Sequence, residues 1–138
     1  MAISHCLETL DGICPNSLLS EQVMNLLDCD NAYDLVNLTL EAKPAFYASI
    51  APLILQLAAS QQEDALLLVN EAATYINKIC QRLLNGNLDR LSLIGGITQV
   101  LIPYLDSQLQ TIIQPAKATP EQGAILYSKT KLTNRVLS

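Results

Sequence analysis

The fold that this sequence predicts is decided by the stretch Leu91-Ser92-Leu93-Ile94-Gly95-Gly96-Ile97. Four residues of strand-forming character lead directly into two glycines, and an apolar helical pattern follows from about Thr98. Paired glycines at such a turn permit positive φ angles and let a ligand or another backbone approach closely, because they carry no Cβ. A lone glycine pair is a weak motif, so a tight structural turn between a strand and a helix is the alternative to a ligand site.

Helical patterns occupy most of the remaining chain. Before the glycine turn, amphipathic spacing and turn residues predict helices over 2–10, 18–28, 32–40, 45–59 and 61–85. The last is the best defined, because its apolar residues recur every three or four positions behind a capping box that runs from Ser60 to Glu63. After the turn, the sequence predicts an amphipathic segment over 98–113, a connector with room for a short strand around 112–115, and a helix over 120–130.

Two prolines mark the helix expected over 45–59. Pro44 suits the first position of the helix, where its missing N–H would have had no helical partner. Pro52 lies inside the pattern, and its ring removes one backbone hydrogen bond. A kink is therefore expected at Pro52.

Composition narrows the class of protein. The 138 residues suffice for one domain, 50% of them are hydrophobic, and few are aromatic, which favours helices over a β-sandwich. The net charge is −5, and basic residues gather only in the tail at Lys129, Lys131 and Arg135, so nucleic acid is not an expected partner. No apolar run has the length of a membrane span, and no signal-peptide pattern opens the chain. A cytoplasmic location without membrane association is therefore expected.

The four cysteines show no paired spacing. Cys6, Cys14, Cys29 and Cys80 are irregularly scattered, and His5 is the one histidine that could complement them. Zinc sites and disulfide frameworks usually show closer, paired cysteines. The sequence therefore predicts free, mostly buried thiols, no metal site, and a solvent-facing or capping His5.

The strand expected at about 90–94 raises the question of its partners. Its residues Leu91, Leu93 and Ile94 are apolar, as in a central parallel strand that is buried on both faces. One strand cannot form a sheet, because the backbone groups on both of its edges need partners. The expected fold class is α/β and predominantly helical, with one strong strand flanked by helices, and the chain is expected to be part of something larger.

Several short stretches share their order and spacing with a known family. They are Leu7-Glu8-Thr9-Leu10-Asp11-Gly12, the Ala-Pro-Leu that opens 51–59, Glu63-Asp64-Ala65, Glu71-Ala72-Ala73, Leu93-Ile94-Gly95-Gly96 and Gly123-Ala124. Over residues 2–128 the chain thereby resembles the C-terminal portion of the BadF/BadG/BcrA/BcrD-type ATPases, which include N-acetylglucosamine and glucosamine kinases. The resemblance implies an actin-like (ribonuclease H-like) ATPase domain, with residues 1–130 as its C-terminal subdomain and 131–138 as a polar tail.

The resemblance also implies a binding site. The glycine pair is similar to the adenosine motif of the family, so Gly95, Gly96, Ile97 and Thr98 are expected to contact a nucleotide, ATP. The family's phosphate loops and catalytic aspartate belong to an N-terminal half, and no matching motif occurs in this sequence. No catalytic residue is therefore assigned. Mg²⁺ is expected only in an intact enzyme, and ATP binding by this chain alone is expected to be weak or absent.

Two functions remain open. One is the adenosine-side fragment of an ATP-dependent amino-sugar kinase, inactive alone, whose partner is the missing N-terminal half or a second copy of the chain. The other is a non-catalytic, mostly helical interaction module that binds no nucleotide. The apolar strand favours the first function, because its unpaired edges would otherwise promote association.

Overall fold

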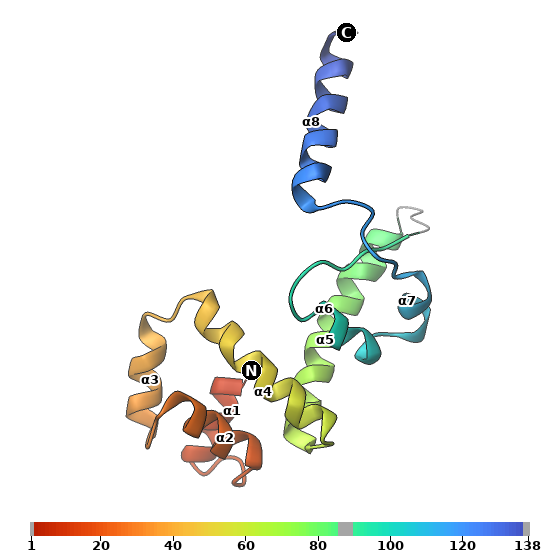
Figure 1. The fold of residues 1–138 in the computed structure, drawn as a ribbon. Coiled ribbons are helices and arrows are strands. Elements are labelled where there is room, and N and C mark those ends of the chain that lie inside the picture. The colour runs from red at the N-terminus through yellow and green to blue at the C-terminus, as the bar shows by residue number, and fades with distance from the viewer. Residues whose placement is uncertain (1, 86–89, 137–138) are drawn as a thin grey trace.

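The chain is mostly helical. The computed structural model describes residues 2–85 and 90–136, and this part of the chain forms eight α-helices, one short 3-10 helix and no strand (Figure 1). Their bounds are α1 Ala2–Leu10, α2 Leu18–Leu27, α3 Ala32–Leu40, α4 Pro44–Ala59, α5 Glu63–Leu84, α6 Thr98–Leu101, η1 Ile102–Tyr104, α7 Ser107–Ile112 and α8 Pro120–Val136. The first five agree with the predicted helices within two residues at each end. Among the described residues, no helix is long and apolar enough to cross a bilayer.

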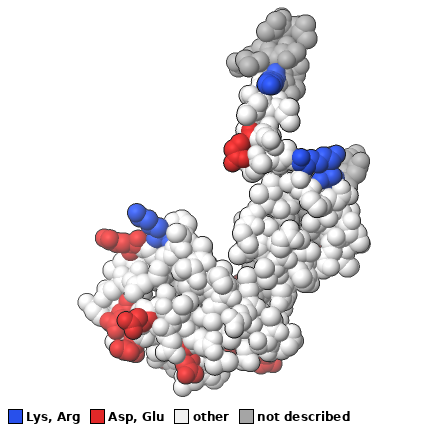
Figure 2. Space-filling model, viewed as in Figure 1, with Lys and Arg blue, Asp and Glu red and all other residues white. Residues whose placement is uncertain are grey.

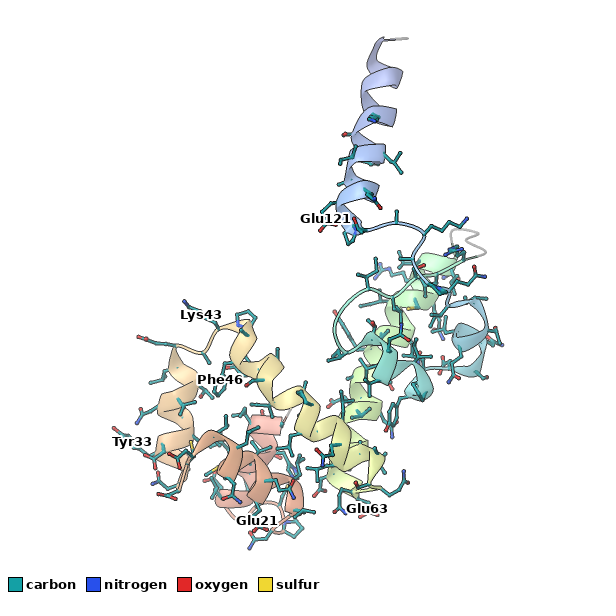
Figure 3. All side chains as sticks on the ribbon, viewed as in Figure 1. Glu21, Tyr33, Lys43, Phe46, Glu63 and Glu121 are labelled. Atoms are coloured by element: carbon teal, nitrogen blue, oxygen red, sulfur yellow. The ribbon has the colours of Figure 1, made fainter. Side chains whose placement is uncertain are left out.

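Helices α1 to α5 form the main core. Helix α1 packs on α2 and α3, and α4 packs on α2 and α5. Side chains that are fully or nearly fully buried fill the space between them, among them Cys6, Leu19, Val23, Leu35, Ile50, Ala58 and Ala65. Phe46 points from α4 into this lobe, whereas Tyr33 points from α3 into solvent (Figure 3). In the view of Figure 2, the surface of this lobe is mostly uncharged, and acidic side chains on it are more common than basic ones, in keeping with the net negative charge.

Local capping explains where α2 and α3 begin. The Ser17 hydroxyl accepts a hydrogen bond from the Ser20 N–H at 3.2 Å, and the Asn31 side-chain oxygen accepts one from the Asp34 N–H at 3.0 Å. Each bond satisfies a backbone donor that the first helical turn leaves without a partner. These caps fix the two turns that fold α1, α2 and α3 against one another.

Helix α5 connects the main core with a smaller apolar cluster. Its first half contributes Ala65 and Val69 to the main core, and its second half contributes Cys80 to a cluster with Leu91 and Leu109. Asp106, just before α7, ties this second cluster to α5. Its carboxylate accepts hydrogen bonds from the side-chain amides of Asn77 at 2.8 Å and Gln81 at 3.1 Å, both on α5.

The prediction of a strand at 90–94 is wrong. Only Leu91 pairs, in a single parallel bridge with Ile113, through Leu91 N–H to Ile112 O at 3.3 Å and Gln114 N–H to Leu91 O at 2.8 Å. The partner segment is too short for a ladder, because α7 continues to Ile112, directly before the bridged residue. Extended backbone therefore pairs at one position instead of forming a strand, and the short strand predicted around 112–115 is reduced to the same bridge.

The segments after the glycine turn also differ from prediction. The amphipathic pattern over 98–113 is divided into α6, η1 and α7, with Pro103 inside the 3-10 turn. Proline cannot donate to a continuing α-helix, which accounts for the break. The last helix continues to Val136 instead of ending near 130, and α8 extends away from the other helices (Figure 1).

Candidate functional site

The glycine turn follows the Leu91 bridge and leads into α6. Gly95 has a φ of +144°, a backbone conformation that side-chain-bearing residues rarely adopt. Gly96 has no heavy atom within 4 Å of the position where a Cβ would lie. The sequence correctly predicted that a glycine is required at this turn, and the requirement is at Gly95.

Thr98 closes the turn by bonding back to Gly95. Its hydroxyl donates to the Gly95 carbonyl oxygen at 2.7 Å, and its N–H donates to the same oxygen at 3.3 Å. Thr98 therefore has an internal structural role. The N–H groups of Gly96 and Ile97 make no hydrogen bond within the described chain, so the turn presents two backbone donors to solvent.

The helix that follows the glycine turn is much shorter than the amphipathic segment predicted over 98–113. Helix α6 has only four residues and continues directly into a 3-10 turn. The dipole of such a short helix is small, because it sums over few peptide units. Any attraction for polar ligand groups at this site therefore comes from the two backbone N–H groups.

The surface around the turn is apolar and open. Ile94 is 59% exposed and Ile97 is 44% exposed, on either side of the two exposed glycines. Exposed apolar side chains therefore flank two backbone N–H groups that have no partner within the described chain, a combination that an aromatic base with acceptor atoms can use. Two described cavities, of about 500 and 370 Å³, lie in the lobe of α1 to α4, and neither is lined by residues 95–98.

Arg90 stabilises the base of the turn and was not singled out from the sequence. Its guanidinium donates to the Gln114 side-chain oxygen at 2.8 Å and to the Pro115 carbonyl oxygen. These bonds hold the start of the turn against the segment that follows α7. A lone arginine before an apolar run carries no local signal, because its partners lie 24 and 25 residues further along the chain.

The prediction of free thiols is confirmed. Cys6, Cys29 and Cys80 are buried free cysteines, and Cys14 is partly exposed. Desolvation raises the pKa of each thiol above its ordinary value, and at Cys14 the carboxylates of Glu8 and Asp64 raise the pKa further. His5 was expected to face solvent or to cap a helix. Its side chain is only 18% exposed and shares a hydrogen bond at 3.1 Å with Ser17, and Ser17 is the residue that caps α2, so this expectation is wrong.

The chain is similar to part of a solved bacterial structure. No protein-family model matches the chain, and no curated protein does. The structure is similar to the crystal structure of a "putative N-acetylglucosamine kinase" from Chromobacterium violaceum, with a TM-score of 0.80 and 25% sequence identity. The match covers 91% of this chain and 43% of that chain, so this chain spans less than half the length of the bacterial protein. The mostly helical architecture is thus shared with part of that structure.

Proposed function

We propose that this chain is the adenosine-side, C-terminal portion of a cytoplasmic, ATP-dependent amino-sugar kinase fold, and that it is catalytically inactive alone. The observation that carries the proposal is the structural match to part of the Chromobacterium violaceum protein over 91% of this chain. The sequence resemblance to the BadF/BadG/BcrA/BcrD-type ATPases supports the same family independently of that structure. Glucosamine or N-acetylglucosamine is the proposed acceptor in the intact enzyme.

In this proposal the glycine turn binds the nucleoside. The adenine and ribose lie on the surface of Gly95 and Gly96, where no side chain intervenes, and the N–H groups of Gly96 and Ile97 donate to acceptor atoms of the ligand. Thr98 acts indirectly, by holding the Gly95 carbonyl in place. ATP is the proposed cofactor.

The remaining chemistry is assigned to the part of the kinase fold that this chain does not span. Transfer of the γ-phosphoryl group to a sugar hydroxyl needs Mg²⁺, loops that hold the phosphates, and a base for the hydroxyl proton. No residue of this chain is proposed as a catalytic group or as an Mg²⁺ ligand. The proposal therefore predicts that this chain can bind ATP but cannot transfer its γ-phosphoryl group.

Exposed apolar side chains on α5 and α8 support the proposal that this chain binds a large protein partner. Tyr75, Ile79 and Leu83 are exposed along the second half of α5, and Ile125 is exposed on α8. A 17-residue helix with little packing is marginally stable in water, so α8 is expected to pack against another surface. The proposed partner is the remaining part of the kinase fold.

The substitution Gly96→Val is expected to weaken ATP binding. A valine side chain fits without a clash inside the protein, because the space around Gly96 is open, but it would occupy the surface proposed for the base. We expect the affinity to fall by about tenfold or more, a loss of at least about 1.4 kcal/mol. Isothermal titration calorimetry of ATP into concentrated protein measures this change.

The matched control is Gly123→Val. It makes the same chemical change at another glycine with nothing within 4 Å, on α8 and away from the turn. Equal ATP affinities in the two variants would contradict the proposed site. Absence of ATP binding by a folded, monomeric wild-type chain would favour the alternative of a helical interaction module.

A further inference from the structure

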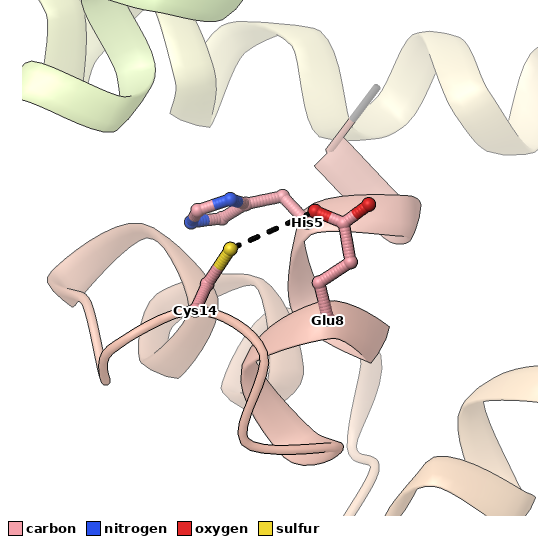
Figure 4. Close-up of side chains that lie close together, drawn as sticks. All are labelled: His5, Glu8 and Cys14. Atoms are coloured by element: carbon pink, nitrogen blue, oxygen red, sulfur yellow. Dashed lines mark hydrogen bonds between the residues drawn. The ribbon is translucent and has the colours of Figure 1, made fainter.

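A second group of functional side chains lies at the start of the chain. His5, Glu8 and Cys14 place one ligand atom each within 4.8 Å of the others (Figure 4). His5 and Glu8 are three residues apart and therefore share one face of α1. Gly12, with a φ of +73°, reverses the chain, and the Cys14 N–H donates to the Glu8 carbonyl oxygen at 3.1 Å, which fixes Cys14 beside that face.

We propose that His5, Glu8 and Cys14 bind a Zn²⁺ ion. Imidazole nitrogen, thiolate sulfur and carboxylate oxygen are the three ligand types that Zn²⁺ takes in proteins. Zinc bonds of about 2.0–2.3 Å in a tetrahedron place neighbouring ligand atoms roughly 3.4–3.6 Å apart. The Cys14 Sγ lies 3.7 Å from the nearer Glu8 carboxylate oxygen, so these two donors already have nearly the required spacing.

The surroundings of His5 match those of a metal-bound histidine. Its Nε2 lies 3.1 Å from the Ser17 hydroxyl and 3.6 Å from an Asp64 carboxylate oxygen. The ring nitrogen of a histidine ligand that does not bind the metal usually interacts with such a hydroxyl or carboxylate, which fixes the orientation of the ring. Nδ1 would therefore bind the ion, and Asp64 would hold the ring through Nε2.

The charge at this site favours a cation. The carboxylates of Glu8 and Asp64 lie near Cys14, and in the described part of the chain no lysine or arginine lies at ion-pair distance from them. The His5 side chain is 18% exposed and that of Asp64 is 34% exposed, so an ion can reach the cluster and would still be partly desolvated. A divalent ion would offset most of the negative charge of the two carboxylates and the thiolate.

The zinc ion would act as a structural link. His5 and Glu8 belong to α1, Cys14 to the loop before α2, and Asp64 to the first turn of α5. Metal binding would therefore stabilise the contact between the amino-terminal hairpin and the α4–α5 pair. Cysteine spacing alone predicted no metal site, because the ligands are of three different types. The available signal was a histidine and a glutamate three residues apart, with a cysteine in the following loop.

Cobalt and zinc titrations of the full chain, without a histidine tag, test the proposal. Co²⁺ bound through a thiolate gives a sulfur-to-metal charge-transfer band, and added Zn²⁺ should displace Co²⁺ and remove the band. We expect one metal ion per chain and a higher thermal unfolding temperature with Zn²⁺ present. Absence of the charge-transfer band from a chain that circular dichroism shows to be folded would overturn the proposal.

Two alanine variants locate the site. Cys14→Ala should lose the charge-transfer band and weaken Zn²⁺ binding by about 100-fold or more, since even the loss of a residue that only orients a ligand weakens binding by about 10- to 100-fold. Cys80→Ala removes a buried thiol from the second cluster and should bind Zn²⁺ like the wild type. His5→Gln should reproduce the Cys14→Ala loss of Zn²⁺ affinity. Zn²⁺ binding that survives in both ligand variants would contradict the assignment.

Discussion

Replacing Leu35 by alanine is expected to destabilise the chain by about 3 kcal/mol. Leu35 is fully buried and is the one buried residue of α3. Its truncation leaves a cavity where α3 meets α1, and the neighbouring side chains can fill that cavity only in part. Because a domain is typically stable by only about 5–15 kcal/mol, this loss would be a large share of the total. Urea denaturation followed by circular dichroism measures it.

The control for this substitution lies on the same helix. Leu38 is 42% exposed, so Leu38→Ala makes the same chemical change with far less loss of packing. We expect it to cost less than about 1 kcal/mol. Equal losses in the two variants would show that α3 is not anchored through Leu35, and the description of the main core would have to change.

Replacing Pro52 by alanine is expected to stabilise the chain by about 1–3 kcal/mol. Pro52 is exposed and lies inside α4, which continues through it from Pro44 to Ala59. Proline lacks the N–H that the preceding turn of the helix would accept, and its ring crowds the carbonyl four residues earlier. Alanine restores the hydrogen bond and removes the crowding. A higher midpoint of thermal unfolding would confirm this expectation.

Pro44→Ala, in the same helix, is expected to have the opposite effect on stability. Pro44 is exposed and occupies the first turn of α4, where a proline costs no hydrogen bond and restricts the unfolded chain. We expect the alanine variant to be slightly less stable than the wild type. Destabilisation by Pro52→Ala would mean that the packing of α4 against α2 and α5 depends on the shape that proline gives to the helix.

The sequence predicted most helices because their signals are local. Helix α5 shows this best, since its buried residues Ala65, Val69, Ala73 and Cys80 lie four, four and seven positions apart, which places them on one face of the helix. The strand at 90–94 failed for a non-local reason. Its pairing depends on an extended partner segment around Ile113, and α7 continues to Ile112, directly before that residue. An apolar run indicates burial, but it does not show whether a neighbouring strand exists.

The candidate site was predicted in part. The need for glycine at the turn followed from the sequence, and the φ of Gly95 agrees with it. The sequence could not show that α6 is only one turn long or that Thr98 bonds back to Gly95. The contacts that hold this region together, from Arg90 to Gln114 and from Asn77 to Asp106, join residues 24 and 29 positions apart. Such pairs have no periodic signal in a single sequence.

The central claim is that the Gly95–Gly96 turn binds the adenosine part of ATP. Its most direct test is a titration of the isotope-labelled chain with ATP and with adenosine, followed residue by residue through the backbone amide signals in NMR spectra. This method detects even weak binding. We predict saturable shifts at Gly95, Gly96, Ile97 and Thr98 with both ligands, and their loss in Gly96→Val. A folded chain whose amides at 95–98 do not shift, or whose shifts lie at the cavities between α1 and α4, would contradict the claim.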